Sequence, residues 1–165
     1  MTAYQITSMM EGVVQRGTAT VLRDVGKPIA GKTGTTNDEK DAWFVGYTPD
    51  IVVGVYIGYD KPRHLARGAT GGHLAAPIVK DFMKFALADK PAIPFKVPAG
   101  IKLIRVDAKS GMRAGPSGGI LEAFKPGTAP PDNYSVIGVA DVEGRSLMAP
   151  PDAGNIMRPG TGGLY

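Results

Sequence analysis

Residues 29–60 read IAGKTGTTNDEKDAWFVGYTPDIVVGVYIGYD, and much of this stretch carries apolar residues at every second position. A period of two predicts β-strands, because successive side chains of a strand point to opposite faces. The three predicted strands cover residues 29–36, 41–48 and 51–59. Pro49 and Asp50 leave room for only a tight connection between the last two strands, which predicts a hairpin.

Two segments with helical spacing are expected to pack on these strands. Residues 2–16 carry apolar residues three and four positions apart, with Thr2 and Gln5 in capping-box form. Gly17 is predicted to end this helix in the left-handed conformation. The second helix is predicted for residues 77–88 and carries one apolar stripe: Ile78, Val79, Phe82, Met83, Ala86 and Leu87.

Antiparallel strands with packed helices define an α+β class, which is the fold class expected here. Trp43 and Phe44 point to opposite faces of their strand, so the sequence predicts a covering layer on both faces of the sheet. Residues 18–25 contain β-branched side chains and are expected to form a short strand or an extended link.

Glycine and proline mark the expected boundaries of the chain. Prolines at positions 91, 94 and 98 interrupt the helical pattern and predict a linker, whereas residues 101–107, 120–124 and 134–142 are the later segments able to become ordered. The expected organisation is a first part at residues 1–90, a proline-rich extension containing a strand at 91–128, and a Gly/Pro-rich, disordered tail at 129–165.

Composition excludes several classes of function. The net charge of +4 is small and no basic run follows the chain, which argues against nucleic acid as a partner. The chain has no cysteine, and His64 and His73 lie in a glycine-rich loop, expected at residues 61–74, without further ligands at suitable spacing, so neither a metal nor a cofactor is expected. Neither a membrane-spanning stretch nor a signal peptide is expected.

The segment GKTGTT at residues 31–36 allows two interpretations. Residues 26–33 match the phosphate-loop pattern G-x-x-x-x-G-K-[ST], but a phosphate loop needs a helix directly after Lys-Thr, and the following residues favour strands instead. The alternative is a substrate-binding K-T-G strand edge. There Lys32 supplies positive charge, Thr33 and Thr35 supply hydroxyl donors, and Gly34 allows a substrate backbone to approach closely.

The sequence surrounding K-T-G resembles the class A penicillin-binding proteins over about residues 3 to 128. The matching segments are 3–5 (AYQ), 12–18 (GVVQRGT), 30–37 (AGKTGTTN), 41–50 (DAWFVGYTPD), 58–60 (GYD), 76–78 (API), 81–83 (DFM) and 124–128 (FKPGT). This resemblance implies part of the serine transpeptidase and β-lactamase fold. It also implies a D,D-transpeptidase that cross-links peptidoglycan stem peptides through an acyl-enzyme, that β-lactams acylate, and that works at the periplasmic face of the inner membrane.

The resemblance also implies roles for the K-T-G residues. Lys32 would line the cleft and support proton transfer, Thr33 and Thr35 would hold the substrate carboxylate, and the backbone N–H of Thr35 would help form the oxyanion hole. Lys32 and Thr35 are therefore the catalytic candidates, and Lys32, Thr33, Gly34 and Thr35 are the candidates for substrate binding.

The nucleophile expected of this family is missing from the sequence. Neither S-x-x-K nor a separate S-x-N occurs, so we expect stem peptide and β-lactams to react only when the remaining part of the domain completes the site. A non-catalytic structural or binding remnant, stabilised by self-association or by a partner, is the alternative function. A nucleotide-binding loop is the third.

Overall fold

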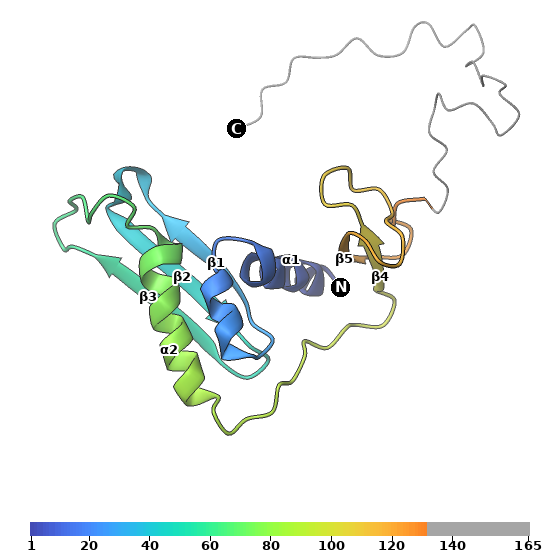
Figure 1. Ribbon diagram of the computed structural model, residues 1–165, viewed down its shortest axis with the longest axis horizontal. Coiled ribbons are helices and arrows are strands. Elements are labelled where there is room, and N and C mark those ends of the chain that lie inside the picture. Colours follow the sequence, from blue (N-terminus) through green and yellow to red (C-terminus); the bar gives the residue numbers. More distant parts are fainter. Residues whose placement is uncertain (132–165) are drawn as a thin grey trace, which may run out of the picture. The chain divides into compact units, whose positions relative to one another are not determined.

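The three strands predicted between residues 29 and 60 form one antiparallel sheet in the computed structural model, which describes residues 1–131 (Figure 1). The strands are β1 (Ala30–Thr35), β2 (Asp41–Tyr47) and β3 (Val52–Gly58), in the order β1-β2-β3. Within the described residues, β1 and β3 are therefore the two edge strands of this sheet.

The predicted hairpin at Pro49-Asp50 is confirmed and is closed by Thr48. The Thr48 amide donates to the Ile51 carbonyl at 2.9 Å, and its hydroxyl oxygen accepts from the amides of Asp50 and Ile51, each at 3.2 Å. Because these bonds satisfy the hydroxyl of Thr48, this side chain can be buried at the end of the sheet.

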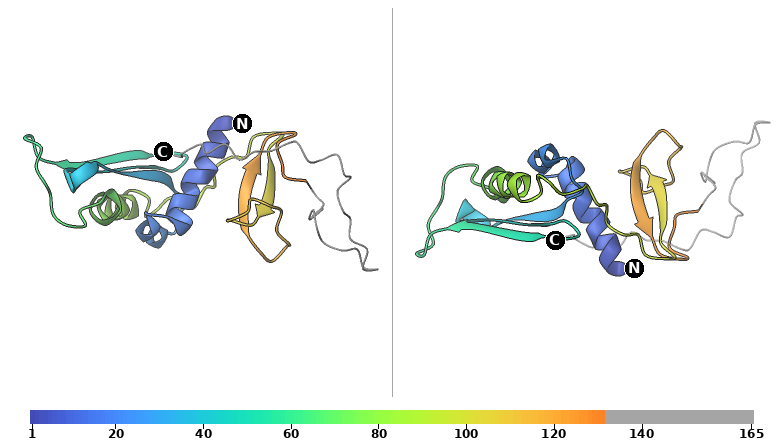
Figure 2. Two further views of the ribbon diagram at one scale, coloured as in Figure 1. Left: turned by 90° about the horizontal axis from the view of Figure 1, so that it is seen from above. Right: turned by 90° about the horizontal axis from the view of Figure 1, so that it is seen from below.

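The hydrophobic core lies on one face of the sheet. Its fully buried large side chains are Leu22, Phe44, Val79 and Met83. They come from three elements, because the core joins β2 to the α-helix α2 (Ala76–Ala86) and to the 3₁₀-helix η1 (Thr20–Val25). Both helices lie on the same side of the sheet in the two views of Figure 2. The expectation of a strand or extended link at residues 18–25 is therefore wrong, and burial of Leu22 explains the helical turn.

The opposite face of the sheet is open over most of its area in the described structure; only its Tyr47 end contacts α1 and Phe95. Trp43 is 44% exposed, Val52 is 73% exposed and Tyr56 is 48% exposed, although Trp43 and Tyr56 stack with ring centroids 4.6 Å apart. The alternation of Trp43 and Phe44 between faces is confirmed, but the prediction of a full layer on both faces is wrong for residues 1–131, because Trp43, Val52 and Tyr56 stay exposed.

Helix α2 is also covered on a narrower stripe than predicted. Val79, Met83 and Leu87 are buried, whereas Ile78 and Phe82 remain about half exposed. The helical segment starts earlier than expected, because the π-helical turn η3 (Gly71–Ala75) leads directly into α2. The predicted loop at residues 61–74 thus ends at Thr70, whose side-chain oxygen accepts from the His73 amide.

Helix α1 (Thr2–Arg16) confirms the first predicted helix, but neither predicted cap forms. No side-chain cap is made at the start of the helix. The side-chain amide of Gln5 donates instead to the Ala123 carbonyl at 2.9 Å. Gly17 has φ −109°, outside the left-handed region. A Cβ there would lie 2.9 Å from the Val13 carbonyl oxygen, so close backbone approach is what requires this glycine.

Two later strands form a second, two-stranded antiparallel sheet: β4 (Lys102–Val106) and β5 (Ile120–Phe124). Both were predicted as ordered segments. The hairpin contacts α1, where Arg16 pairs with Glu122 at 2.9 Å. Met1–Pro130 accordingly form one compact unit. The candidate segment at 134–142 and almost all of the predicted tail at 129–165 lie outside the described residues.

Candidate functional site

The four K-T-G candidates lie side by side on the edge strand β1. Its register with β2 pairs Lys32 with Val45, Thr33 with Phe44, Gly34 with Trp43 and Thr35 with Ala42. Lys32 and Gly34 therefore share the exposed face of the sheet, and Thr33 and Thr35 share the face of the core. This is the alternation that the sequence predicted.

The backbone of β1 presents hydrogen-bonding groups to its free edge. The Thr36 amide donates toward β2, to the Asp41 carbonyl at 3.1 Å. In an antiparallel edge strand the residues adjacent to such a bonded position turn their N–H and C=O outward, which places the Thr35 N–H at the free edge. The Thr33 carbonyl is also at that edge, because the ammonium of Lys32 reaches it at 2.9 Å.

The hydroxyls of Thr33 and Thr35 are each held by a residue from another part of the chain. The oxygens of Thr18 and Thr33 are 2.8 Å apart, and the Gly71 amide donates to the Thr35 hydroxyl oxygen at 3.1 Å. Because the Thr35 oxygen accepts this bond, its own proton stays available for an acceptor such as a carboxylate. Sequence reasoning missed both partners of these hydroxyls, Thr18 and Gly71.

The start of the segment formed by η3 and α2 lies against β1 at Thr35. The first amides of a helix carry partial positive charge and attract anions. Lys32 adds a full positive charge on the same strand. The edge of β1 therefore combines a cation, two hydroxyls and outward backbone amides, a combination suited to an extended peptide that ends in a carboxylate.

Gly71 permits this contact because its backbone touches the sheet directly. A Cβ at Gly71 would lie 2.1 Å from the Trp43 carbonyl oxygen and 2.7 Å from the Gly34 carbonyl oxygen. We expect Gly71→Ala to lower the free energy of unfolding by about 1–3 kcal/mol, measured by chemical denaturation. Gly54→Ala is the matched control within the sheet, since its Cβ would meet nothing closer than Val45 at 3.9 Å. Equal losses in the two variants would contradict this account.

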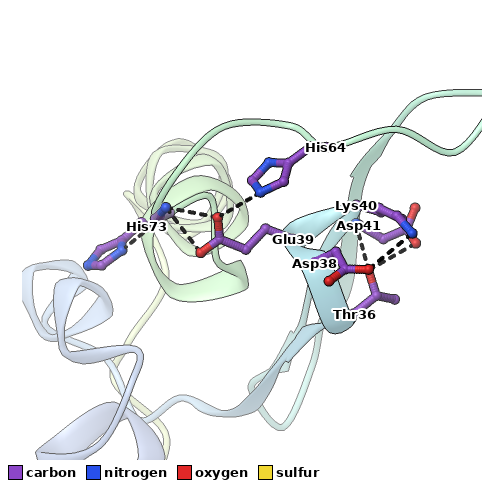
Figure 3. Close-up of polar contacts among 8 residues, drawn as sticks. Thr36, Asp38, Glu39, Lys40, Asp41, His64 and His73 are labelled. Carbon is purple, nitrogen blue, oxygen red and sulfur yellow. Dashed lines mark hydrogen bonds and ion pairs between the residues drawn. The ribbon is translucent and has the colours of Figure 1, made fainter.

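The charged turn that follows β1 is bonded to the loop before Gly71 (Figure 3), and Asp41 at its end is bonded to Tyr56 of β3. The Thr36 hydroxyl oxygen accepts from the Asp41 amide at 2.8 Å. The Tyr56 hydroxyl donates to the Asp41 carboxylate at 2.8 Å, and this bond is the main reason that the pKa of Tyr56 is raised. Both oxygens of Glu39 accept from the Gly68 amide, at 3.1 and 3.0 Å.

The two histidines were expected to be solvated loop residues. His64 has a carboxylate nearby, since its Nε2 is 3.8 Å from Glu39, and His73 has its Nδ1 3.3 Å from the Thr70 hydroxyl. No group of three or more His, Asp or Glu side chains in residues 1–131 is arranged to hold a metal ion.

The phosphate-loop interpretation lacks its structural context. Lys32 and Thr33 lie inside β1, which pairs antiparallel with β2, so no helix begins at Lys-Thr. The backbone amides of residues 26–33 cannot then converge on a phosphate as they do at the start of a helix.

The fold and the β1 edge define an α+β protein with lysine and threonine side chains on an edge strand. The family model described as penicillin binding protein transpeptidase domain matches residues 1–84, and the chain belongs to this family. This assignment agrees with the resemblance seen in the sequence around K-T-G.

Individual relatives agree with the family. The chain is 55% identical to penicillin-binding protein 1A of Rickettsia conorii over 122 residues, which are 74% of this chain and 15% of that protein. It is 45% identical to penicillin-binding protein 1A of Pseudomonas aeruginosa over 135 residues, covering 79% of this chain and 16% of that protein. The chain thus spans about 15% of the length of the curated relatives it matches.

A solved structure confirms the α+β transpeptidase-like fold. The crystal structure of penicillin-binding protein 1A from Haemophilus influenzae matches with a TM-score of 0.69 and 34% sequence identity. The match covers 80% of this chain and 21% of that protein chain, so the similarity again extends over a part of a longer protein.

Proposed function

We propose that this chain forms the K-T-G side of a peptidoglycan D,D-transpeptidase site. The observation that carries the proposal is the edge of β1, where Lys32, a Thr35 hydroxyl held by the Gly71 amide, and outward backbone groups lie together. The substrate would be a stem peptide ending in D-Ala-D-Ala, bound as an added strand along β1.

The residues of β1 would bind and polarise this substrate. The terminal carboxylate would accept from the hydroxyls of Thr33 and Thr35 and lie near the ammonium of Lys32. The Thr35 N–H would donate to the oxygen of the carbonyl under attack, where negative charge develops in the transition state. A serine of the completing part of the domain would attack that carbonyl, and the terminal D-alanine would leave with a proton.

The family membership supports the class of substrate. Penicillin-binding protein relatives at 45–57% identity favour peptidoglycan stem peptides and β-lactams as ligands of the completed site. The periplasmic face of the inner membrane is the proposed location, and the same site would be an antibiotic target. In the described part of the chain, no helix combines the length and the apolar character needed to cross a bilayer.

A peptide titration tests this binding role on the chain itself. We expect diacetyl-Lys-D-Ala-D-Ala to shift the amide resonances of residues 31–36 and 70–72, and the same peptide with a C-terminal amide to shift them much less. Loss of one charge-assisted hydrogen bond costs about 1.5–3 kcal/mol, so Thr35→Val is expected to weaken binding about ten- to hundredfold.

The alternative function makes a different prediction for the same titration. A structural remnant that works through self-association would leave the β1 resonances unchanged with either peptide and would show a mass above that of one chain in solution. Binding that does not distinguish the carboxylate from the amide would also contradict the transpeptidase proposal.

A further inference from the structure

Glu39 joins the turn after β1 to the loop that precedes α2. Its amide donates to the Thr36 carbonyl at 3.1 Å, and its carbonyl accepts from the Leu65 amide at 3.0 Å. Its two carboxylate oxygens accept from the Gly68 amide at 3.1 and 3.0 Å (Figure 3). Each polar group of Glu39 is thus hydrogen-bonded, and two of its three hydrogen-bond partners lie in the loop, as does His64, whose Nε2 is 3.8 Å from the carboxylate.

The backbone at this position is held in an unfavourable conformation. Asp38 and Glu39 have φ values of 62° and 49°, in the left-handed region. Such residues cost on the order of 1–3 kcal/mol each and persist where surrounding bonds hold them. The Asp38 side chain is 70% exposed and pairs only with Lys40 at 3.2 Å in the described structure, so it gives the loop no support.

A short series of bonds continues from Gly68 to the candidate site. The Gly68 carbonyl is bonded by the Thr70 amide at 2.9 Å and lies 3.2 Å from the His73 ring. The amide and the side chain of His73 are both bonded to the Thr70 hydroxyl. Gly71, which directly follows Thr70, donates its amide to the Thr35 hydroxyl oxygen. The segment 68–73 is therefore one hydrogen-bonded turn with Glu39 at one end and Thr35 at the other.

We propose that Glu39 is a positioning residue, which acts through residues 68–71 to orient the Thr35 hydroxyl. By fixing Gly68, its carboxylate keeps the Gly71 amide directed at the Thr35 oxygen. That oxygen then serves as an acceptor, and its proton is directed away from Gly71 toward the ligand. The part of this inference that concerns a ligand carboxylate rests on the function proposed above; the link from Glu39 to Thr35 does not.

Amide hydrogen exchange on the full chain tests the link without any ligand. In Glu39→Ala we expect the Gly68 and Gly71 amides to exchange at least about tenfold faster, because local opening becomes easier. Amides in the β2–β3 pair should keep their rates. Glu39→Gln retains one acceptor oxygen and should restore most of the protection. Asp38→Ala is the matched control, because it removes a neighbouring carboxylate whose backbone is also in the left-handed region. It should change the Gly71 rate less than about threefold.

Peptide affinity then tests the effect on Thr35. With diacetyl-Lys-D-Ala-D-Ala as the probe, Glu39→Ala should weaken binding about three- to tenfold by misorienting one charge-assisted donor. The double variant with Thr35→Val should bind no more weakly than Thr35→Val alone, because both changes remove the same interaction.

The outcomes separate this inference from the proposed function. Faster exchange at Gly68 with unchanged exchange at Gly71 would overturn the positioning role, as would fully additive losses of affinity in the double variant. If the unsubstituted chain does not bind the peptide, the proposed function fails, and the Gly71 exchange rate decides the positioning role alone. The unfolding midpoint of each variant shows whether a loss of protection or affinity comes from lower stability of the whole chain. A lowered midpoint with uniformly faster amide exchange would also count against the proposal.

Discussion

Lys32→Ala is expected to lower the rate of acylation by labelled penicillin by about 10²–10⁴-fold, the range typical for loss of a residue that assists proton transfer. The measurement needs a serine nucleophile, and the sequence contains no S-x-x-K. We suggest a chimera in which residues 1–130 replace the matching part of Haemophilus influenzae penicillin-binding protein 1A, since the two structures agree with a TM-score of 0.69. The acylation rate is then followed by fluorescence of the labelled adduct.

Two controls make this result specific. Lys84→Ala removes an exposed lysine of α2 and should leave the rate unchanged. The isolated chain should give no stoichiometric serine-linked adduct in an intact-mass measurement. A folded chimera that is not acylated, or one in which both lysine variants react like the parent, would contradict the proposed role of Lys32. A serine adduct on the isolated chain would refute the hypothesis that this chain cannot form the acyl-enzyme.

The candidate residues of β1 could be predicted from sequence because K-T-G is a local pattern. Strand alternation places Lys32 and Thr33 on opposite faces, and the register with β2 confirms this. The bonds that hold the site could not be predicted in the same way. Gly71 donates to Thr35 from 36 positions away, and Glu39 reaches Gly68 from 29 positions away. The spacing of apolar residues along the sequence carries no information on contacts between residues that are so far apart.

Helix ends and covering layers show a second limit of sequence reasoning. A glycine after a helix predicts a left-handed residue, but Gly17 is required by close contact with the Val13 backbone instead. The β-branched residues before Gly26 favour extended structure, yet burial of Leu22 in the core stabilises a 3₁₀-helix there. Tertiary packing outweighs the local preference in both places.

The neighbouring aromatic residues of β2 turn this limit into a stability prediction. Phe44 is fully buried in the core, whereas Trp43 is 44% exposed on the open face of the sheet. Phe44→Ala should lower the free energy of unfolding by about 3–5 kcal/mol, because it removes a buried ring and leaves a cavity. Trp43→Ala should cost about 0.5–1.5 kcal/mol, mainly the stacking with Tyr56.

The comparison is informative because side-chain size alone ranks the two residues the other way. Both variants would be unfolded in denaturant and followed by circular dichroism, since Trp43→Ala removes the only tryptophan and with it the fluorescence signal. A loss for Trp43→Ala as large as that for Phe44→Ala would mean that the open face is covered in solution. Self-association would then be the first explanation to test, and the difference between the two variants should reappear as the protein is diluted.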